Sequence, residues 1–150
     1  LNRTNQNSIA VSINQAIFSE DAGKLQTLLE DFMLKSISSM DGANEGFYHG
    51  MMLGLCAVLG NRYQVRSNRE AGLGRFDIQL MPLTKGVPGF IFEFKHTNDE
   101  HADLKSLAES ALRQIEQKRY DTELCDAGVH AIIKIGIAFR GKSAVVRRAS

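Results

Sequence analysis

The chain lacks the features that define several large classes of protein. It contains only two cysteines in 150 residues, Cys56 in an apolar run and Cys125 in an expected loop. Two cysteines without close spacing form neither a disulfide framework nor a zinc site, and this usage suits a reducing cytoplasm. No stretch approaches the ~18 apolar residues of a membrane span, and no signal peptide is recognisable. We therefore expect a cytoplasmic protein without a membrane segment.

The chain also lacks a strong charge of either sign. It has 18 Lys and Arg against 17 Asp and Glu, a formal net charge of +1. This balance excludes a global basic field of the kind that drives non-specific nucleic-acid binding, so any such contact must come from local clusters. The basic residues gather in three places: Arg62, Arg66, Arg69 and Arg75; Arg113, Lys118 and Arg119; and Arg140, Lys142, Arg147 and Arg148. A solvated surface is the alternative for each cluster, and a frayed tail for the last.

The length fits one domain with a real core. The chain begins at Leu1 instead of methionine, which is compatible with a piece of a longer protein. Apolar residues at helical spacing run through two N-terminal segments: Ile9, Ile13, Ile17, Leu25, Leu28, Leu29, Phe32 and Met33. Such a stripe is too apolar to remain in water. We expect residues 1–40 to form a helical extension that packs on the rest of the chain, residues 41–148.

Helix and strand patterns alternate along the remaining residues. We expect helices over about 45–59 and 102–119, and strands over 63–67, around Asp77, around Glu93, over 131–139 and over 144–146. This order predicts an α/β sandwich around a mixed sheet.

Two expected strands, residues 74–80 and 90–95, carry the most informative pattern. Side chains in a strand alternate between its two faces. Asp77 therefore lies on the face opposite to its apolar neighbours, and Glu93 and Lys95 share a face. If the strands pair as a hairpin through the proline-flanked loop between them, two carboxylates and one ammonium converge on one face of the sheet.

This combination is what a magnesium-dependent phosphodiesterase needs. Carboxylate oxygens suit a hard cation that also grips a phosphate, and a nearby lysine can stabilise charge on the phosphorus or hold the attacking water. Glu93 and Lys95 lie between phenylalanines in a strand with a central pattern, where an unpaired charge would be costly. The alternative interpretation is a salt-bridged ladder of charges on a solvated sheet face.

Seven short motifs occur in a fixed order. They are Tyr48-His49-Gly50, Ser67-Asn68-Arg69-Glu70, Gly74-Arg75-Phe76-Asp77, Phe92-Glu93-Phe94-Lys95, Ala111-Leu112-Arg113-Gln114-Ile115, Lys118-Arg119-Tyr120 and Gly136-Ile137-Ala138-Phe139. In this order the chain resembles the PD-(D/E)XK nuclease superfamily, in particular the nuclease-like domain at the C-terminal end of bacterial proteins that begin with an AAA-type ATPase-like region. The resemblance covers roughly residues 40 to 146.

The resemblance implies a restriction-endonuclease-like fold, with a central mixed sheet flanked by helices and residues 41–148 as the nuclease-like domain. It implies that Asp77 and Glu93 hold Mg²⁺ or Mn²⁺, with the main-chain carbonyl of Phe94 as a further ligand. Lys95 would orient or activate the water, and Glu45 would be an outer ligand, often through water.

The same resemblance assigns further roles around this site. Gln114 and Tyr120 would steady the site or the phosphate from a helix. From the local basic clusters, and not from the resemblance, we expect Arg69, Arg75 and Lys118 to contact nucleic acid. The sequence departs from the pattern at one position: Phe76, and not a proline, precedes Asp77. This departure does not change the metal-binding role that the resemblance implies for Asp77.

We therefore expect a metal-dependent nuclease that hydrolyses phosphodiester bonds of nucleic acid. DNA is the expected substrate. The expected partners are nucleic acid and an ATPase-like domain in the same parent chain, and a homodimer is compatible with this reading. One alternative is a non-catalytic nucleic-acid-binding or regulatory module attached to an ATPase. Another is an interaction domain in which the charged ladder has no catalytic meaning.

Overall fold

The computed structural model of the protein describes residues 2–36, 45–70, 75–118, 121–129 and 131–149. Its helices are α1 (Asn2–Phe18), α2 (Ala22–Ser36), α3 (Glu45–Cys56), α4 (Leu104–Lys118) and α5 (Asp121–Asp126), and a short 3-10 turn, η1 (Ala57–Leu59), follows α3. Its strands are β1 (Tyr63–Glu70), β2 (Arg75–Pro82), β3 (Gly89–His96), β4 (Ile132–Arg140) and β5 (Ser143–Arg148).

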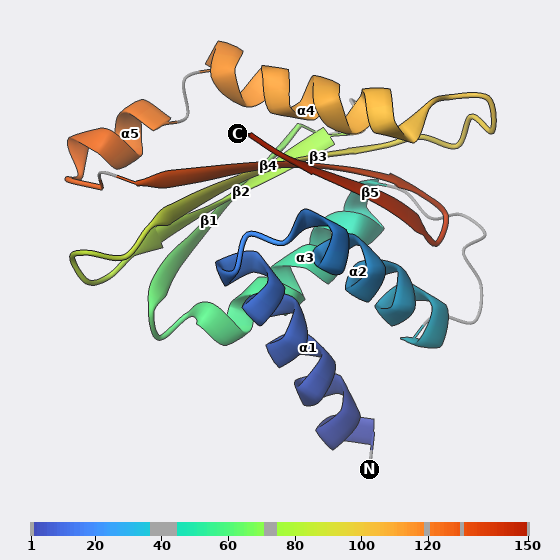
Figure 1. Ribbon diagram of the computed structural model, residues 1–150, viewed down its shortest axis with the longest axis horizontal. Coiled ribbons are helices and arrows are strands. Elements are labelled where there is room, and N and C mark those ends of the chain that lie inside the picture. The colour runs from blue at the N-terminus through green and yellow to red at the C-terminus, as the bar shows by residue number, and fades with distance from the viewer. Residues whose placement is uncertain (1, 37–44, 71–74, 119–120, 130, 150) are drawn as a thin grey trace.

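The strands form one sheet in the order β1-β2-β3-β4-β5. Neighbouring strands are antiparallel except β3 and β4, which are parallel and are connected through α4 and α5. Figure 1 shows α4 on one side of the sheet and α1, α2 and α3 on the other. We call these sides the α4 face and the α3 face. The predicted α/β sandwich around a mixed sheet is confirmed.

The α3 face carries a closely packed aromatic core. Phe76 stacks on Phe94 with ring centroids 4.4 Å apart, and Phe94 continues the stack to Phe92 and to Phe139 of β4. Helix α3 adds Tyr48, whose ring lies parallel to Phe139 at 4.6 Å. Because a shift of β2, β3 or β4 by one residue would turn the phenylalanine rings of that strand to the other face, this core fixes the register of the strands.

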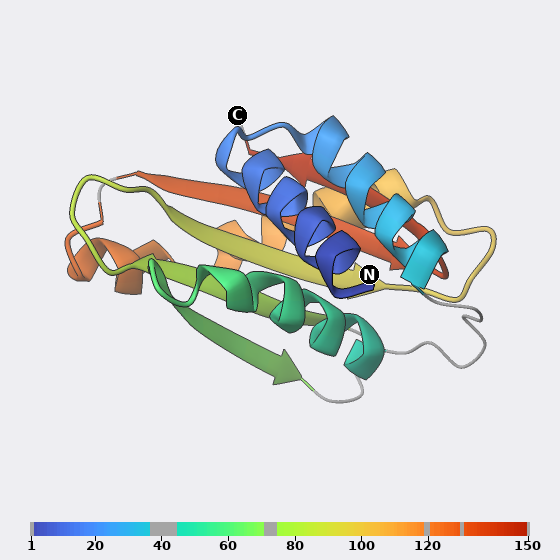
Figure 2. The same ribbon diagram turned by 90° about the horizontal axis from the view of Figure 1, so that it is seen from below.

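Helices α1 and α2 belong to the same core. Ile13, Leu25, Leu29 and Met33 are fully buried within it, and Figure 2 shows the two helices side by side next to α3 on this face. Burying each such side chain is worth about 1.5–3 kcal/mol. The sheet therefore draws part of its stability from the first two helices.

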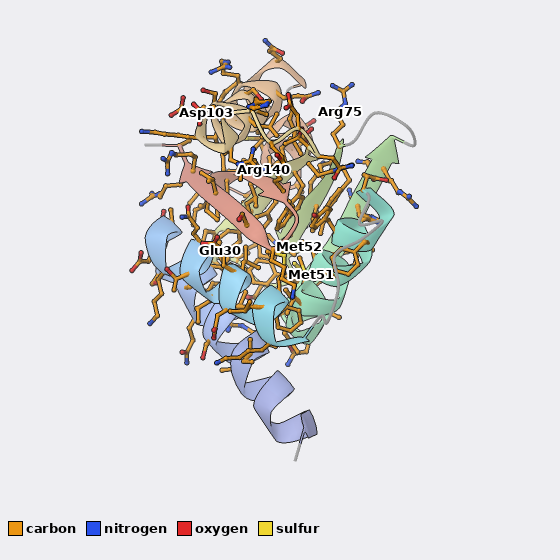
Figure 3. All side chains as sticks on the ribbon, turned by 90° about the vertical axis from the view of Figure 1, so that its right-hand side faces the viewer. Glu30, Met51, Met52, Arg75, Asp103 and Arg140 are labelled. Carbon is orange, nitrogen blue, oxygen red and sulfur yellow. The ribbon has the colours of Figure 1, made fainter. Side chains whose placement is uncertain are left out.

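Helix α2 also covers the outer edge of β5. Gln26 Oε1 accepts a hydrogen bond from the backbone N–H of Val146 at 3.0 Å, and Glu30 Oε2 accepts one from Ala144 at 3.4 Å. Figure 3 shows Glu30 on α2 beside this strand. Residues four apart on a helix advance by about 6 Å and strand residues two apart by about 6.8 Å, so the two side chains match alternate outward-facing N–H groups. The covered edge is thereby withdrawn from pairing with another chain.

On the opposite side, α4 packs closely against the sheet at Gly136 of β4. A Cβ atom at this position would lie 2.4 Å from the carbonyl oxygen of Ala108 and 3.0 Å from the backbone nitrogen of Leu112. Ala108 and Ala111, both residues of α4, are fully buried. The missing side chain of Gly136 is therefore what allows the helix backbone to approach the strand.

The C-terminal strand is longer than the sequence predicted. Strand β5 continues to Arg148, beyond the expected residues 144–146, and is paired with β4 over this length. Arg148 Nη2 donates to Glu20 Oε1 at 2.6 Å, so Arg147 and Arg148 of the last basic cluster are part of the sheet and not of a frayed tail.

Two further predictions about the elements differ from the structure, and a third concerns residues that the structure does not describe. Cys125 lies in α5 and not in a loop, and the expected helix over 45–59 ends at Cys56, where η1 begins. The expected boundary between residues 1–40 and residues 41–148 lies outside the described residues. None of the helices within the described ranges has the length and apolar character needed to cross a membrane.

We predict that Gly136→Ala lowers the free energy of unfolding by about 1–3 kcal/mol or more, because the new methyl group meets the backbone of α4 and cannot be accommodated by turning a side chain. Gly54→Ala in α3 is the matched control, since nothing lies within 4 Å of its Cβ position; it should be neutral or stabilising by about 0.5–1 kcal/mol. Urea denaturation measures both. Equal effects of the two variants would contradict the close approach of α4.

Candidate active site

Two carboxylates face each other across the β2–β3 pair. Asp77 is the direct register partner of Glu93, and only 3% and 1% of their surfaces are exposed. Directly opposed strand residues have Cβ atoms about 4.5–5.5 Å apart, so the two carboxylates lie close together on the α4 face. This is the convergence that strand alternation predicted. Their burial does not fit the alternative of a solvated ladder of charges.

Two neutral side chains bind the charged groups of this cluster. Asn68 of β1 is the register partner of Asp77, and its Nδ2 donates to Asp77 Oδ1 at 3.2 Å. Lys95 follows Glu93 on the same face of β3 and is half-buried. Its Nζ donates to Ser110 Oγ of α4 at 3.2 Å. The site is therefore built from β1, β2, β3 and α4 together.

Helix α4 contributes a second polar residue, Gln114, one turn after Ser110. Gln114 is buried, and its Oε1 accepts no hydrogen bond from the described residues. Four helix residues and two strand residues advance by similar distances, about 6 and 6.6 Å. Gln114 therefore lies at the level of Glu93, as Ser110 lies at the level of Lys95.

The oxygen atoms of this cluster suit Mg²⁺ or Mn²⁺. Hard cations prefer oxygen ligands, and Mg²⁺ commonly binds through one or two carboxylates while it keeps several water molecules. Two buried carboxylates of like charge repel each other, and a cation shared by Asp77 and Glu93 would remove that cost. Within the described part of the chain, no group of three or more Asp, Glu, His or Cys residues could hold a metal ion. Further ligands would therefore be a carbonyl, an amide oxygen such as that of Gln114, or water.

Glu45, the expected outer ligand, lies on the α3 face. It is the first residue of α3 and is buried, and its Oε2 accepts a hydrogen bond from Arg69 Nε at 2.5 Å. Arg69 is the register partner of Phe76, which places it on the face of the aromatic core. Burial lowers the pKa of the nearby His96, and the Glu45 carboxylate partly offsets this shift. The structure thus does not bring Glu45 to the face of the paired carboxylates.

The basic residues divide between the two faces of the sheet. Arg75 lies on the α4 face, where Figure 3 shows its side chain on the side of the sheet away from α3. Arg66 also belongs to this face, because its register partner Gln79 lies two residues from Asp77 in β2 and so shares its face. Arg66 is half-buried. The side chain of Lys118 and the whole of Tyr120 lie outside the described residues.

Sequence reasoning did not assign roles to Asn68 or Ser110. Asn68 was part of a recognised motif, but its partnership with Asp77 depends on the register between β1 and β2. Ser110 carried one signal, its spacing of four residues from Gln114, which places both on one side of a helix. Phe94 is paired on both sides, with β2 and β4, and the ligand role of its carbonyl remains a prediction.

A hollow of about 730 Å³ lies at the other end of β3. It is lined by residues 82–88 at the end of β2 and in the loop that follows, by residues 127–129 and 131–133, and by Glu20. Its lining includes none of Asp77, Glu93 and Lys95. The hollow is therefore separate from the paired carboxylates, which lie on the α4 face.

Comparison with known proteins gives one match. A family model described as the PD-(D/E)XK nuclease superfamily matches residues 43–149. The match includes α3, all five strands and α4, and it begins after α1 and α2. Neither the comparison with curated proteins nor the comparison with solved structures gives a significant match.

We predict that Arg69→Ala lowers the free energy of unfolding by about 1–3 kcal/mol, because it leaves the buried carboxylate of Glu45 without its charged donor. Adding Glu45→Gln should restore part of the loss, since the remaining group is then neutral. Arg66→Ala on the same strand is the control and should change stability by no more than about 0.5 kcal/mol. Urea denaturation is measured for the wild type, for Arg69→Ala, Glu45→Gln and Arg66→Ala singly, and for the double variant, and an additive loss in the double variant would contradict the pairing.

Proposed function

The chain belongs to the PD-(D/E)XK nuclease superfamily, and from this membership we propose that it is a metal-dependent nuclease that hydrolyses phosphodiester bonds of nucleic acid, with DNA as the proposed substrate. The observation that carries the proposal is the buried pair of Asp77 and Glu93, directly opposed in the sheet, with Lys95 on the same face. The mixed sheet with helices on both sides is consistent with the restriction-endonuclease-like fold of this superfamily.

In this proposal Asp77 and Glu93 hold Mg²⁺ or Mn²⁺, with the carbonyl of Phe94 and the side chain of Gln114 as candidate further ligands. When bound there, a divalent ion would supply Lewis-acid chemistry: it would polarise the phosphate and lower the pKa of a bound water. Asn68 donates to Oδ1 of Asp77, which restricts the rotation of the carboxylate and directs its other oxygen away from β1. Lys95 holds the water or stabilises the charge that develops on the phosphate.

The same arrangement divides the proposed contacts with the nucleic acid. We propose that Arg75 and Arg66 contact phosphates next to the carboxylates, because both lie on the α4 face. Arg69 contributes less directly, since its Nε is bound to Glu45 on the other face. The contact of Lys118 with nucleic acid and the role of Tyr120 remain parts of the proposal that rest on the sequence, because the side chain of Lys118 and the whole of Tyr120 lie outside the described residues.

A cytoplasmic location and an ATPase-like domain in the same parent chain are further parts of the proposal that rest on the sequence. The formal net charge of +1 also favours one rival, a non-catalytic nucleic-acid-binding or regulatory module, because the chain carries no strong net positive charge. Cleavage and metal binding separate the two readings.

We predict that the protein cleaves at least one of plasmid, linear duplex and single-stranded DNA with Mg²⁺ or Mn²⁺. Asp77→Asn and Lys95→Ala should each lower the rate about 100-fold or more, the order of loss found when one group that stabilises transition-state charge is removed. Asp126→Asn and Lys105→Ala, exposed residues outside the site, are the matched controls and should retain full activity. Equal cleavage by the wild type and both site variants would point to contamination and contradict the proposal.

We also predict that Mn²⁺ raises the melting temperature of the wild type and not that of Asp77→Asn, because only the folded wild type holds the complete pair of carboxylates. Without metal the variant should be at least as stable as the wild type, since it removes one of two buried like charges. Differential scanning fluorimetry with and without EDTA measures both effects, and calorimetric titration gives the affinity. Metal binding without cleavage would favour the non-catalytic module.

A further inference from the structure

Ser110 lies beside the lysine of the proposed active site without having been assigned a part in it. Its Oγ accepts a hydrogen bond from Lys95 Nζ at 3.2 Å, and the same hydroxyl donates to the carbonyl oxygen of Leu107 at 2.6 Å. A serine hydroxyl has a single proton. Because the hydroxyl uses that proton in its hydrogen bond to the Leu107 carbonyl, the oxygen of Ser110 can only accept a hydrogen bond from Lys95.

We propose that Ser110 is a positioning residue that holds the Lys95 ammonium in the place where it acts on the attacking water or the phosphate. The inference rests on the proposed function. Lys95 ends a flexible four-carbon stem, and a lysine loses considerable rotamer freedom when its ammonium is confined. A fixed acceptor that confines the ammonium before the substrate binds lowers the part of this cost that would otherwise fall on the reaction.

The surroundings of Ser110 make it a rigid acceptor. On either side of it in the helix, Ala108 and Ala111 are fully buried against the sheet. The backbone carbonyl of Ala108 lies so close to Gly136 that a methyl group there would collide with it. The first turn of α4 is held by Asp103, which accepts hydrogen bonds from the backbone of Lys105 and from the hydroxyl of Ser106. The position of the Ser110 hydroxyl is therefore set by the contact between α4 and β4.

The test compares three substitutions of Ser110 in the full chain, with Mg²⁺ and the DNA substrate that the wild type cleaves. Ser110→Ala removes the acceptor, Ser110→Cys keeps the volume but offers only a weak acceptor, and Ser110→Thr keeps the hydroxyl. We expect kcat to fall about 10-fold for Ala and Cys, the loss of one hydrogen bond to a charged group, with KM changed by no more than about two-fold. Thr should restore most of the activity.

The control variant is Ser106→Ala, one turn earlier on the same helix, whose exposed hydroxyl bonds to Asp103 and not to the site. A double-mutant cycle separates positioning from structure. In a Lys95→Ala background, Ser110→Ala should cause no further loss, because the group that it positions is absent. Melting temperatures of all variants, with and without metal, show whether the fold is intact.

The outcomes distinguish this inference from the function on which it rests. An active wild type with unchanged kcat in Ser110→Ala and Ser110→Cys overturns the positioning role and leaves the nuclease assignment intact. A further loss in the Lys95→Ala background, or no recovery with threonine, shows that Ser110 acts by another route and also overturns it. A wild type that cleaves none of the substrates with either metal overturns the proposed function, and this inference with it.

Discussion

The arrangement of the site depends on one unfavourable interaction, the direct opposition of Asp77 and Glu93 in the middle of the sheet. Both side chains are buried, and like charges directly across a strand pair are destabilising. A fold selected for stability alone would place apolar or oppositely charged residues there. The neighbouring groups on this face reduce the cost: Asn68 donates to Asp77, and Lys95 brings a positive charge next to Glu93 in the same strand. A shared divalent cation would complete this compensation, which ties the stability of the apo protein to its proposed activity.

What holds the two carboxylates opposite each other is packing on the other side of the same strands. Phe76 and Phe94, the next residues along β2 and β3, are also register partners, and their rings stack at 4.4 Å. A slip of one residue would carry these rings to the α4 face and the carboxylates into the aromatic core. The two errors would be made together, so the strong preference of the aromatic core for one register is transferred to the site. The apolar side of the hairpin thus sets the geometry of its polar side.

The faces of the hairpin could be predicted from the sequence because they follow from a local rule. Alternation alone placed Asp77, Glu93 and Lys95 together, and the proline-flanked loop indicated the pairing. The position of Glu45 could not be obtained in this way. A helix that begins with a glutamate can approach either face of a sheet, and the choice depends on which face the rest of the helix buries. Here Tyr48 and Met52 enter the aromatic core, which carries Glu45 to the α3 face and leaves Arg69 as its partner. Ser110 was missed for a related reason, since its contact with Lys95 depends on the depth to which α4 settles on Gly136.

Helices α2 and α4 both contact the sheet through the same match between helix spacing and strand spacing. A step of four helix residues nearly equals a step of two strand residues, about 6 against 6.6–6.8 Å. On one side, Gln26 and Glu30 of α2 use this match to accept hydrogen bonds from alternate N–H groups of β5. On the other, Ser110 of α4 binds Lys95 of β3, and the same step along the helix puts Gln114 at the level of Glu93. The first match closes an edge and the second presents polar groups to a site, but both require a helix held close and nearly parallel to a strand. Side chains that serve structure at one edge of the sheet and those proposed to serve catalysis near its centre are therefore placed by one geometric relation.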